Sequence, residues 1–341
     1  MLNQVYRLVS ARQFESQTID ENLTSNEIIV RPTYLSICKA DQRYFSGNRS
    51  QTVLKQKLPM ALIHEAIGTV VFDPQNEFSV GETVAMIPNT PSHQSKIVKE
   101  NYLSNNHFRS SGYDGFMQEY VFLRRDRVIK IPKEFEPNMA AFTEMISVGV
   151  QALTNLKETM DADQDIIGIW GDGNLGYIIA SLAKSFFPNS KVLVFGRHQY
   201  KLDYFSFVDE TYLVSDIPPE LKVSHALECT GGTGSQIAVD QIINHIRPMG
   251  TIMLLGVSEN PIEINTRLVL ERGLTLRGSS RSSRGDFQSA IDILAKDCKT
   301  QDRLCNLIGE TQKVSSIKEV VSFFEKDSAS SWGKGVMRWA I

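Results

Sequence analysis

Residues 165–187 have the sequence DIIGIWGDGNLGYIIASLAKSFF, which indicates the class of fold. A short apolar run at 165–170 predicts a buried strand, and apolar residues at helical spacing predict a helix over about 174–187. Between them stands the glycine pattern GxGxxG, formed by Gly171, Gly173 and Gly176. A strand, a glycine-rich turn and a helix in this order are typical of a dinucleotide-binding βαβ unit.

Each glycine of this pattern has a physical role in such a unit. Gly171 makes the tight turn, Gly173 lets the backbone approach a pyrophosphate, and Gly176 lets the helix pack closely on the strand. Asn174 and Leu175 open the helix, whose N-terminus favours an anion. We therefore predict that residues 171 and 173–176 bind the pyrophosphate of a dinucleotide.

The end of the next predicted strand, at 191–195, indicates which dinucleotide is bound. Units that bind NAD usually place Asp or Glu there to accept hydrogen bonds from the ribose hydroxyls. This chain has Gly196 at that position, followed by Arg197. A glycine leaves room for a 2′-phosphate, which Arg197 can pair with, and Lys201 or His198 can add charge. The pattern predicts NADPH over NADH, although a basic cluster on a surface turn would look the same.

The pattern of predicted strands and helices differs between the first part of the chain and the part that contains this unit. Residues 1 to about 135 contain short β-type runs, which predict an irregular, largely antiparallel unit with strands at 27–36, 66–72, 82–87 and 116–123. After a helical pattern at 139–156, strands alternate with helices, which predicts a parallel sheet. Its later elements are expected at 223–229, 235–246, 251–257 and 275–278. The tail from about 284 reads as mostly helical (286–296 and 317–326), with a last strand at 335–340.

Composition limits the class of protein. The chain has 341 residues and a net charge of −3, from 36 Lys and Arg against 39 Asp and Glu. That length favours two domains, and the charge argues against a nucleic-acid partner. Its longest apolar stretch, 166–183, is broken by glycine and polar residues, so no membrane span is expected. Four isolated cysteines suggest a reducing compartment, and we expect a cytoplasmic protein.

Four side chains in the first half could hold a metal: Cys38, His64, Glu65 and Glu144. Catalytic zinc takes three protein ligands from Cys, His and carboxylate and keeps one position open. Spacing alone does not decide here, because a lone cysteine or histidine is often an ordinary core residue.

Six motifs in order give the chain a resemblance to the zinc-dependent medium-chain dehydrogenase/reductase superfamily, over essentially its whole length. They are SICKAD at 36–41, IHEAIG at 63–68, GFMQEYV at 115–121, FTEMISVG at 142–149, GDGNLG at 171–176 and ECTG at 228–231. The glutamate of FTEMISVG is typical of the polyol dehydrogenase branch. The resemblance implies an α/β fold in two parts, with a GroES-like β-rich catalytic domain at 1–148 and 285–341 and a doubly wound Rossmann domain at 149–284.

The resemblance also implies roles for single residues. Cys38 and His64 would be zinc ligands, with Glu144 as the third ligand and Glu65 as an alternative or transient one. Asp41 would orient His64. Further along the chain, Cys229 would pack near the nicotinamide ribose, and Thr230 beside it is a predicted cofactor contact.

The chain departs from the family in two places. Residues 89–108, where relatives carry four cysteines around a structural zinc, contain no cysteine, and His93 and His107 alone cannot close such a site. We therefore expect one catalytic zinc and no structural zinc. The hydroxyl residue that relays protons in many relatives is Ala40 here. Proton exchange is left open among Glu65, Glu144 and Lys39.

Within the superfamily, the segments 33–47 and 60–66 and the cysteine-free loop resemble the ribulose-5-phosphate reductases, which supply CDP-ribitol for teichoic acid or capsule polymers. The resemblance implies a sugar-phosphate substrate, a homodimer or homotetramer paired near 275–278, and possible association with the pathway cytidylyltransferase. Lys39, Arg43 and Arg49 could hold the substrate phosphate, although each could equally be a solvated surface charge. Two alternatives stay open: a dehydrogenase of an unphosphorylated polyol such as sorbitol or xylitol, and a metal-free NADPH-binding structural protein.

Overall fold

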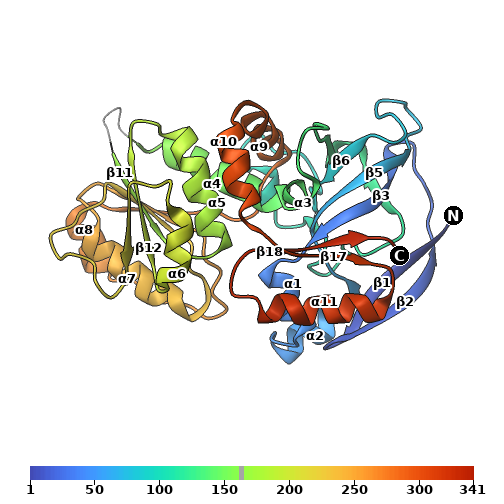
Figure 1. The fold of residues 1–341 in the computed structure, drawn as a ribbon, viewed down its shortest axis with the longest axis horizontal. Helices are drawn as coiled ribbons and strands as arrows, with labels where there is room; N and C mark the ends of the chain where they lie inside the picture. The colour runs from blue at the N-terminus through green and yellow to red at the C-terminus, as the bar shows by residue number, and fades with distance from the viewer. Residues whose placement is uncertain (161–164) are drawn as a thin grey trace. The chain divides into compact units, whose positions relative to one another are not determined.

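The computed structural model describes residues 1–160 and 165–341, which form two compact units. The first unit comprises Met1–Ser147 and Ser282–Ile341, and the second comprises Val148–Arg281 (Figure 1). The chain therefore leaves the first unit, builds the second and returns to complete the first. Every helix within the described residues is too short or too polar to span a bilayer.

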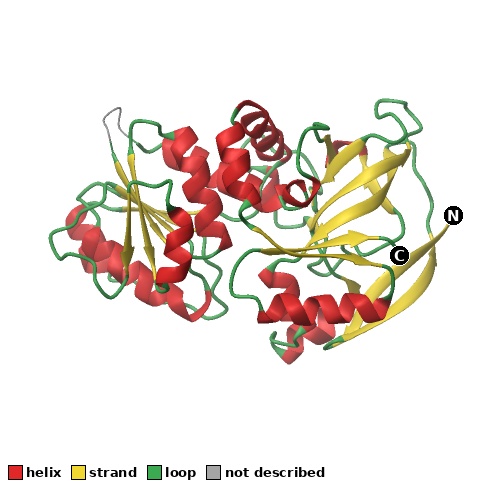
Figure 2. Cartoon of the chain, viewed as in Figure 1, coloured by secondary structure: helices red, strands yellow, loops and turns green. Residues whose placement is uncertain are grey.

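The second unit is built on a six-stranded sheet in which every neighbouring pair is parallel. Figure 2 shows helices on either side of these strands. This arrangement confirms the doubly wound fold expected from the glycine-rich stretch. In spatial order the strands are β13 (Glu210–Leu213), β12 (Lys191–Gly196), β11 (Ile166–Trp170), β14 (His225–Glu228), β15 (Thr251–Leu254) and β16 (Thr275–Gly278). The helices are α5 (Asn174–Phe186), α6 (Gln199–Leu202), α7 (Ser235–His245) and α8 (Thr266–Arg272), with α4 (Thr143–Lys157) leading in from the first unit.

The strands of this sheet are apolar along almost their whole length because both faces of the sheet are buried. Ile167 and Ile169 of β11 and Val192 and Val194 of β12 are all fully buried. Strands of a parallel sheet are covered on both faces, so they do not alternate between apolar and polar residues. Helix α5 packs against both strands and buries the whole of 176–183. The Gly171 turn is thereby held at the carboxyl end of β11.

The first unit contains a seven-stranded sheet and a three-stranded sheet. In the larger sheet, β10 (Val128–Lys130), β6 (Thr83–Met86), β5 (Glu65–Phe72), β3 (Glu27–Ser36), β18 (Lys334–Trp339) and β17 (Ile308–Val314) follow one another, with β9 (Val121–Arg124) also on β3. All of these pairs are antiparallel except β17 with β18. The smaller sheet has the order β2 (Gln13–Asp20), β1 (Leu2–Ser10), β4 (Met60–Ala61). Figure 1 shows α11 (Ile317–Ala329) against β17 and β18.

Five further helices belong to the described part of the first unit, and four of them have eight residues or fewer. They are α1 (Lys39–Phe45), α2 (Gln51–Lys57), α3 (Pro137–Ala140), α9 (Arg284–Lys296) and α10 (Cys298–Cys305).

Some expectations from the sequence were wrong in detail. The strand expected at 116–123 begins only at Val121, because residues 115–117 donate to the carbonyl oxygens of 61–63 and Gln118 forms an isolated bridge to Val5 of β1. The helix expected at 139–156 is divided into α3 and α4. The tail is less helical than expected, since β17 lies between α10 and α11. The β1–β2 hairpin was not predicted, because the exposed face of β2 is polar and only Phe14 of that strand is buried.

The cysteine-free stretch 89–108 is organised around a buried arginine. Arg127 donates from Nη1 to the Asn89 carbonyl oxygen at 3.0 Å and to Glu100 Oε1 at 3.0 Å. Strands β7 (Asn89–Thr90) and β8 (His107–Phe108) pair within this stretch. Both of its histidines are exposed, and His107 stacks on Tyr113 with ring centroids 4.1 Å apart. An ion pair and backbone hydrogen bonds therefore hold this stretch to the unit.

The turn after β5 is held by a buried carboxylate. Asp73 accepts hydrogen bonds from the backbone N–H groups of Gln75 at 3.0 Å and of Glu77 and Phe78 at 2.9 Å each, and from the Arg125 guanidinium. Burial alone would raise the pKa of Asp73, but these donors outweigh it and lower the pKa to about 2. The folded state therefore favours the charged carboxylate.

We expect Asp73→Asn to lower the free energy of unfolding at pH 7 by about 2 kcal/mol, from the difference between a pKa of 3.8 unfolded and about 2 folded. Because the folded pKa is depressed, this contribution is present above pH 3.8 and is lost as the pH falls through about 2. Urea unfolding of both proteins between pH 7 and pH 3 should show that the difference in their free energies of unfolding becomes smaller as the pH falls. A difference in the free energy of unfolding that does not change with pH would contradict the lowered pKa of Asp73. Asp302→Asn, at an exposed position, is the control.

Candidate functional site

A possible metal site in the first unit consists of Cys38, His64 and Glu65. One ligand atom from each, the Cys38 Sγ, a His64 ring nitrogen and a Glu65 carboxylate oxygen, lies within 4.8 Å of the others. Cys38 precedes α1 as its N-cap, and Glu65 begins β5 directly after His64. Both His64 and Glu65 are buried. The fold thus brings together three residues that the sequence proposed as ligands.

A buried carboxylate fixes the loops that carry these residues. Asp41 accepts hydrogen bonds from the Cys38 and Ile63 backbone N–H groups, both at 3.1 Å, and from the Ser110 hydroxyl at 2.6 Å. Its Oδ1 lies 3.4 Å from His64 Nδ1. Burial would raise the pKa of Asp41, but His64 and these donors outweigh it and lower the pKa. Ser110, distant in sequence, gave no signal of this contact.

Glu65 is paired with a cation that was not singled out from the sequence. Lys334 Nζ lies 2.8 Å from both carboxylate oxygens of Glu65 and donates to the Ile37 carbonyl oxygen at 2.9 Å. Glu65 is fully buried and Lys334 is 1% exposed. Burial would lower the pKa of Lys334, but Glu65 and Cys38 outweigh it and raise the pKa. Lys334 therefore supplies a fixed positive charge behind the cluster.

Glu144 lies in the first turn of α4 and is buried. Its carboxylate does not belong to the group of three ligand atoms that lie within 4.8 Å of one another. Burial, together with the negative charges of Glu65 and Asp41, raises the pKa of Glu144 to about 7, while His64 and Lys334 oppose the rise. This carboxyl group is therefore poised between its charged and neutral forms at neutral pH.

The donors of the cluster fit a zinc ion. A thiolate, an imidazole and a carboxylate are the ligand types that catalytic zinc takes, with a fourth position left open. His64 Nδ1 and Glu65 Oε2 are buried and make no hydrogen bond with the described residues, although each faces an opposite charge. Of residues 1–160 and 165–341, this is the one group of three or more His, Cys, Asp or Glu side chains close enough to share an ion.

The geometry of the glycine-rich turn in the second unit requires glycine at two of its three glycine positions. Gly171 adopts a φ of +137°, which favours glycine. A Cβ at Gly176 would lie 2.0 Å from the Gly171 carbonyl oxygen, so the close packing of α5 on β11 requires glycine there. A Cβ at Gly173 would meet nothing within 4 Å. Its own surroundings do not require glycine, and the space beside it, where Asn174 and Leu175 begin α5, is open to a ligand.

Packing inside the second unit explains why residue 196 is a glycine, and this explanation could not be read from the sequence. A Cβ there would lie 2.7 Å from Asp172 Cβ and 2.7 Å from Leu202 Cδ2, so packing within the protein already requires glycine. Arg197 is exposed, and its side chain has no polar partner among the described residues. Lys201 is partly buried, with Nζ 5.9 Å from the Tyr200 ring centroid. Two cations thus follow β12 on one turn.

The ECTG segment at the end of β14 is held by its glutamate. Glu228 Oε1 accepts hydrogen bonds from the backbone N–H groups of Thr230 at 2.9 Å and Gly231 at 3.1 Å. The Thr230 hydroxyl donates to the Trp170 carbonyl oxygen at 3.3 Å, which ties this loop to the end of β11. Cys229 is buried, and burial raises the pKa of its thiol well above the usual value. Thr230 therefore lies at the same sheet edge as the glycine-rich turn.

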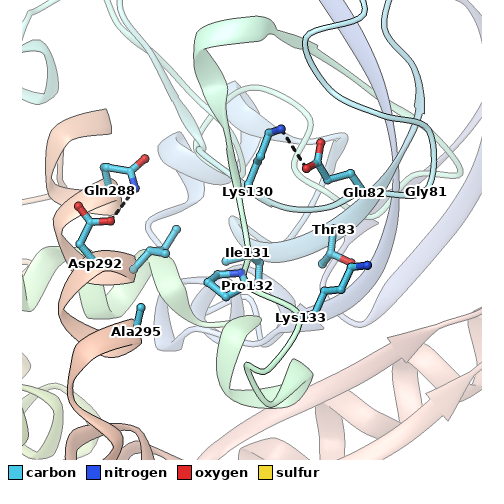
Figure 3. A pocket seen from close by; sticks show the side chains of 11 residues that line it. Gly81, Glu82, Thr83, Lys130, Ile131, Pro132, Lys133, Gln288, Asp292 and Ala295 are labelled. Atoms are coloured by element: carbon cyan, nitrogen blue, oxygen red, sulfur yellow. Dashed lines mark hydrogen bonds and ion pairs between the residues drawn. The ribbon is translucent and has the colours of Figure 1, made fainter.

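Two remaining features of the first unit lie outside the metal cluster. Lys39, the first residue of α1, is exposed. A hollow of about 430 Å³ is lined by residues of 81–83, 130–133 and 288–295, with Lys130 paired to Glu82 (Figure 3). None of the predicted site residues lines this hollow.

Comparison with known proteins identifies the family. Residues 24–133 match the alcohol dehydrogenase GroES-like domain, and residues 206–296 match the zinc-binding dehydrogenase family. The chain is 52% identical to the ribulose-5-phosphate reductase of Bacillus spizizenii and 49% identical to ribulose-5-phosphate reductase 2 of Staphylococcus aureus, each over 100% of both chains. The chain belongs to the zinc-dependent medium-chain dehydrogenases. It is therefore an oxidoreductase of this family.

A solved structure of this dehydrogenase family extends the comparison. The crystal structure of S. aureus TarJ in complex with NADPH has a TM-score of 0.90 and 44% identity, with 100% of both chains covered. The GroES-like and Rossmann parts expected from the sequence are thus confirmed. The zinc-binding family of this chain agrees with the cluster of possible metal ligands in the first unit. The NADPH bound by this relative agrees with the glycine-rich turn of the second unit.

Proposed function

We propose that this dehydrogenase reduces D-ribulose 5-phosphate to D-ribitol 5-phosphate with NADPH and one zinc ion. The observation that carries the proposal is full-length identity of about half to two ribulose-5-phosphate reductases, in a chain whose Cys38, His64 and Glu65 side chains form a cluster that could hold zinc. In the wider setting, the product would feed CDP-ribitol formation for teichoic acid or capsule polymers, beside a cytidylyltransferase.

The residues of the first unit would divide the catalytic work. When bound, zinc polarises the substrate carbonyl and NADPH supplies the hydride. Cys38 and His64 would hold the metal with Glu65 or Glu144 as third ligand, and Asp41 keeps His64 oriented. If Glu65 is the third ligand, Glu144, a buried carboxyl group in the first turn of α4, would hold the proton that the product oxygen takes up. Lys39 stays a third candidate for that role.

We propose a single zinc per chain and no structural zinc. In support, residues 89–108 contain no cysteine, and the ion pair of Arg127 with Glu100 ties them to the unit. A closed structural site needs four ligands, usually with several thiolates.

NADPH would bind the second unit through the residues predicted from the sequence. Gly171, Gly173, Asn174, Leu175 and Gly176 would take the pyrophosphate. Arg197 and Lys201, which follow Gly196, would take the 2′-phosphate, and Thr230 would contact the cofactor from the end of β14.

Arg197→Ala should weaken NADPH binding roughly 10- to 100-fold and change NADH binding less than about threefold, because only NADPH carries the phosphate that Arg197 pairs with. Quenching of protein fluorescence by each cofactor measures both dissociation constants. Arg267→Ala, which removes a highly exposed arginine of the same unit, is the matched control. Equal losses for NADPH and NADH would contradict the assignment.

The partners and setting of the enzyme are also proposals. Lys39, Arg43 and Arg49, in α1 and just after it, would place positive charge near the metal ligands for the substrate phosphate. Strand β16 ends the six-stranded sheet, and its free edge would pair with a second copy in a homodimer or homotetramer. All four cysteines are free thiols, which suits the cytoplasm.

The experiment that tests this function is an initial-rate assay of NADPH oxidation with D-ribulose 5-phosphate, ribulose, fructose and xylulose 5-phosphate. We expect kcat/KM for ribulose 5-phosphate to exceed that for ribulose at least 100-fold, since hydrogen bonds to a charged group contribute about 1.5–3 kcal/mol each and two of them suffice for this ratio. Faster turnover of an unphosphorylated sugar would instead identify a polyol dehydrogenase.

A further inference from the structure

We propose that Asp172, the second residue of the glycine-rich turn, is a positioning residue that builds the binding site for the 2′-phosphate of NADPH. The inference rests on the proposed use of NADPH. It assigns a role to a residue that belongs to neither the pyrophosphate-binding glycines nor the basic residues after β12. Asp172 would place the Arg197 side chain by fixing the backbone of Arg197 and the adjacent His198.

The geometry of the Asp172 carboxylate carries the proposal. Its Oδ2 accepts three hydrogen bonds, from the Arg197 N–H at 2.8 Å, the His198 N–H at 2.9 Å and His198 Nδ1 at 2.9 Å. Asp172 is buried, whereas Arg197 is exposed. The carboxylate thus fixes two successive peptide groups of the turn while the Arg197 side chain stays outside.

The neighbouring glycine is part of the same arrangement. Asp172 Cβ would lie 2.7 Å from a Cβ at position 196, so Asp172 can reach the end of β12 only because that residue is Gly196. Sequence reasoning assigned the glycine to the space that a 2′-phosphate needs. The structure shows that the space beside its Cα is filled by Asp172, which indicates that Gly196 and Asp172 form one packed unit.

The charge of Asp172 is consistent with a phosphate nearby. A carboxylate at the end of this strand normally accepts hydrogen bonds from the ribose hydroxyls and repels a 2′-phosphate. Here Oδ2 faces three protein donors instead, and Lys201 adds positive charge. Burial would raise the pKa of Asp172, but these neighbours outweigh it and lower the pKa. The carboxylate therefore serves as an internal anchor whose charge is offset before the cofactor binds.

The test compares cofactor binding by Asp172→Ala and Asp172→Asn in the full-length protein, with dissociation constants for NADPH and NADH from fluorescence quenching. We expect Asp172→Ala to weaken NADPH binding at least tenfold and NADH binding less than threefold. Asp172→Asn keeps an acceptor for the two backbone N–H groups but loses the negative charge opposite His198. We therefore expect its NADPH affinity to lie between that of wild type and that of Asp172→Ala. Equal losses of both cofactors, or no loss with either variant, would overturn the proposal.

A double variant separates action through Arg197 from an independent effect. If Asp172 positions Arg197, Asp172→Ala in an Arg197→Ala background should cost less than threefold in NADPH affinity. Additive losses would contradict this. Should Asp172→Ala fail to fold, Asp172→Asn decides in its place, in both backgrounds. Because binding is measured without substrate, a wild type that selects NADPH but does not reduce ribulose 5-phosphate would refute the proposed reaction and leave this inference standing.

Discussion

Replacing Cys38 with alanine is expected to remove the zinc and abolish ketone reduction while NADPH still binds. Cys38 supplies the only thiolate of the three-residue cluster, and the two other members cannot hold the ion with comparable affinity. Losing the electrophile should lower kcat/KM by at least about 1,000-fold, since a catalytic metal contributes several kcal/mol. Metal analysis of the purified protein gives zinc per chain, and cofactor quenching gives the NADPH dissociation constant.

Cys298 provides a matched control for this variant. It is an exposed cysteine in the same unit, so Cys298→Ala removes a thiol without touching the cluster. We expect this control to keep its zinc and its activity. A Cys38→Ala protein that retains one zinc per chain and full turnover would show that the metal is held elsewhere.

The second large effect is expected at the buried ion pair behind the cluster. Lys334→Met should lower the free energy of unfolding by about 3–5 kcal/mol, because it leaves the Glu65 carboxylate buried without its cation. Urea unfolding of the protein after removal of its metal by a chelator measures this loss, because a metal bound at Glu65 would supply a second cation. Lys334→Arg keeps the charge and should lose much less.

A double variant distinguishes an unpaired charge from lost packing. In Lys334→Met with Glu65→Gln, no buried charge is left alone, so we expect a large part of the stability to return. If the double variant is no more stable than Lys334→Met alone, the loss comes from packing around the longer side chain. A Lys334→Met protein within 1 kcal/mol of wild type would refute the electrostatic explanation.

The parts of the fold that depend on local pattern could be predicted from the sequence. The β11, turn and α5 sequence at 166–186 combines an apolar strand, three glycines and an apolar helix, and each of these is a short-range signal. The return of the chain to the first unit was expected from the change of pattern after about residue 284, where helices and a last strand follow the alternating part. The parallel pairing of β17 with β18 was not expected, because pairing between strands depends on tertiary contacts that no local pattern records.

Some residues of the candidate site could likewise be proposed from the sequence, and others could not. Cys38, His64 and Glu65 could be proposed because their side chains have metal-binding chemistry, and the fold brings them together. Lys334 could not, because it is 269 residues from Glu65 in the sequence and an isolated lysine normally indicates an exposed position. Gly196 was predicted as a cofactor residue, but the packing of Asp172 against it became visible only when the turn and the end of β12 were seen side by side.

The proposed reaction requires that zinc and NADPH act together in the reduction of a sugar phosphate. The most direct measurement is the rate of NADPH oxidation with D-ribulose 5-phosphate, recorded on the zinc-loaded enzyme, after removal of the metal by a chelator, and after zinc is restored. We predict turnover by the loaded enzyme, a loss of at least about 1,000-fold on stripping, and recovery with one zinc per chain. No turnover of ribulose 5-phosphate by the loaded enzyme, or turnover unchanged by stripping, would contradict the account.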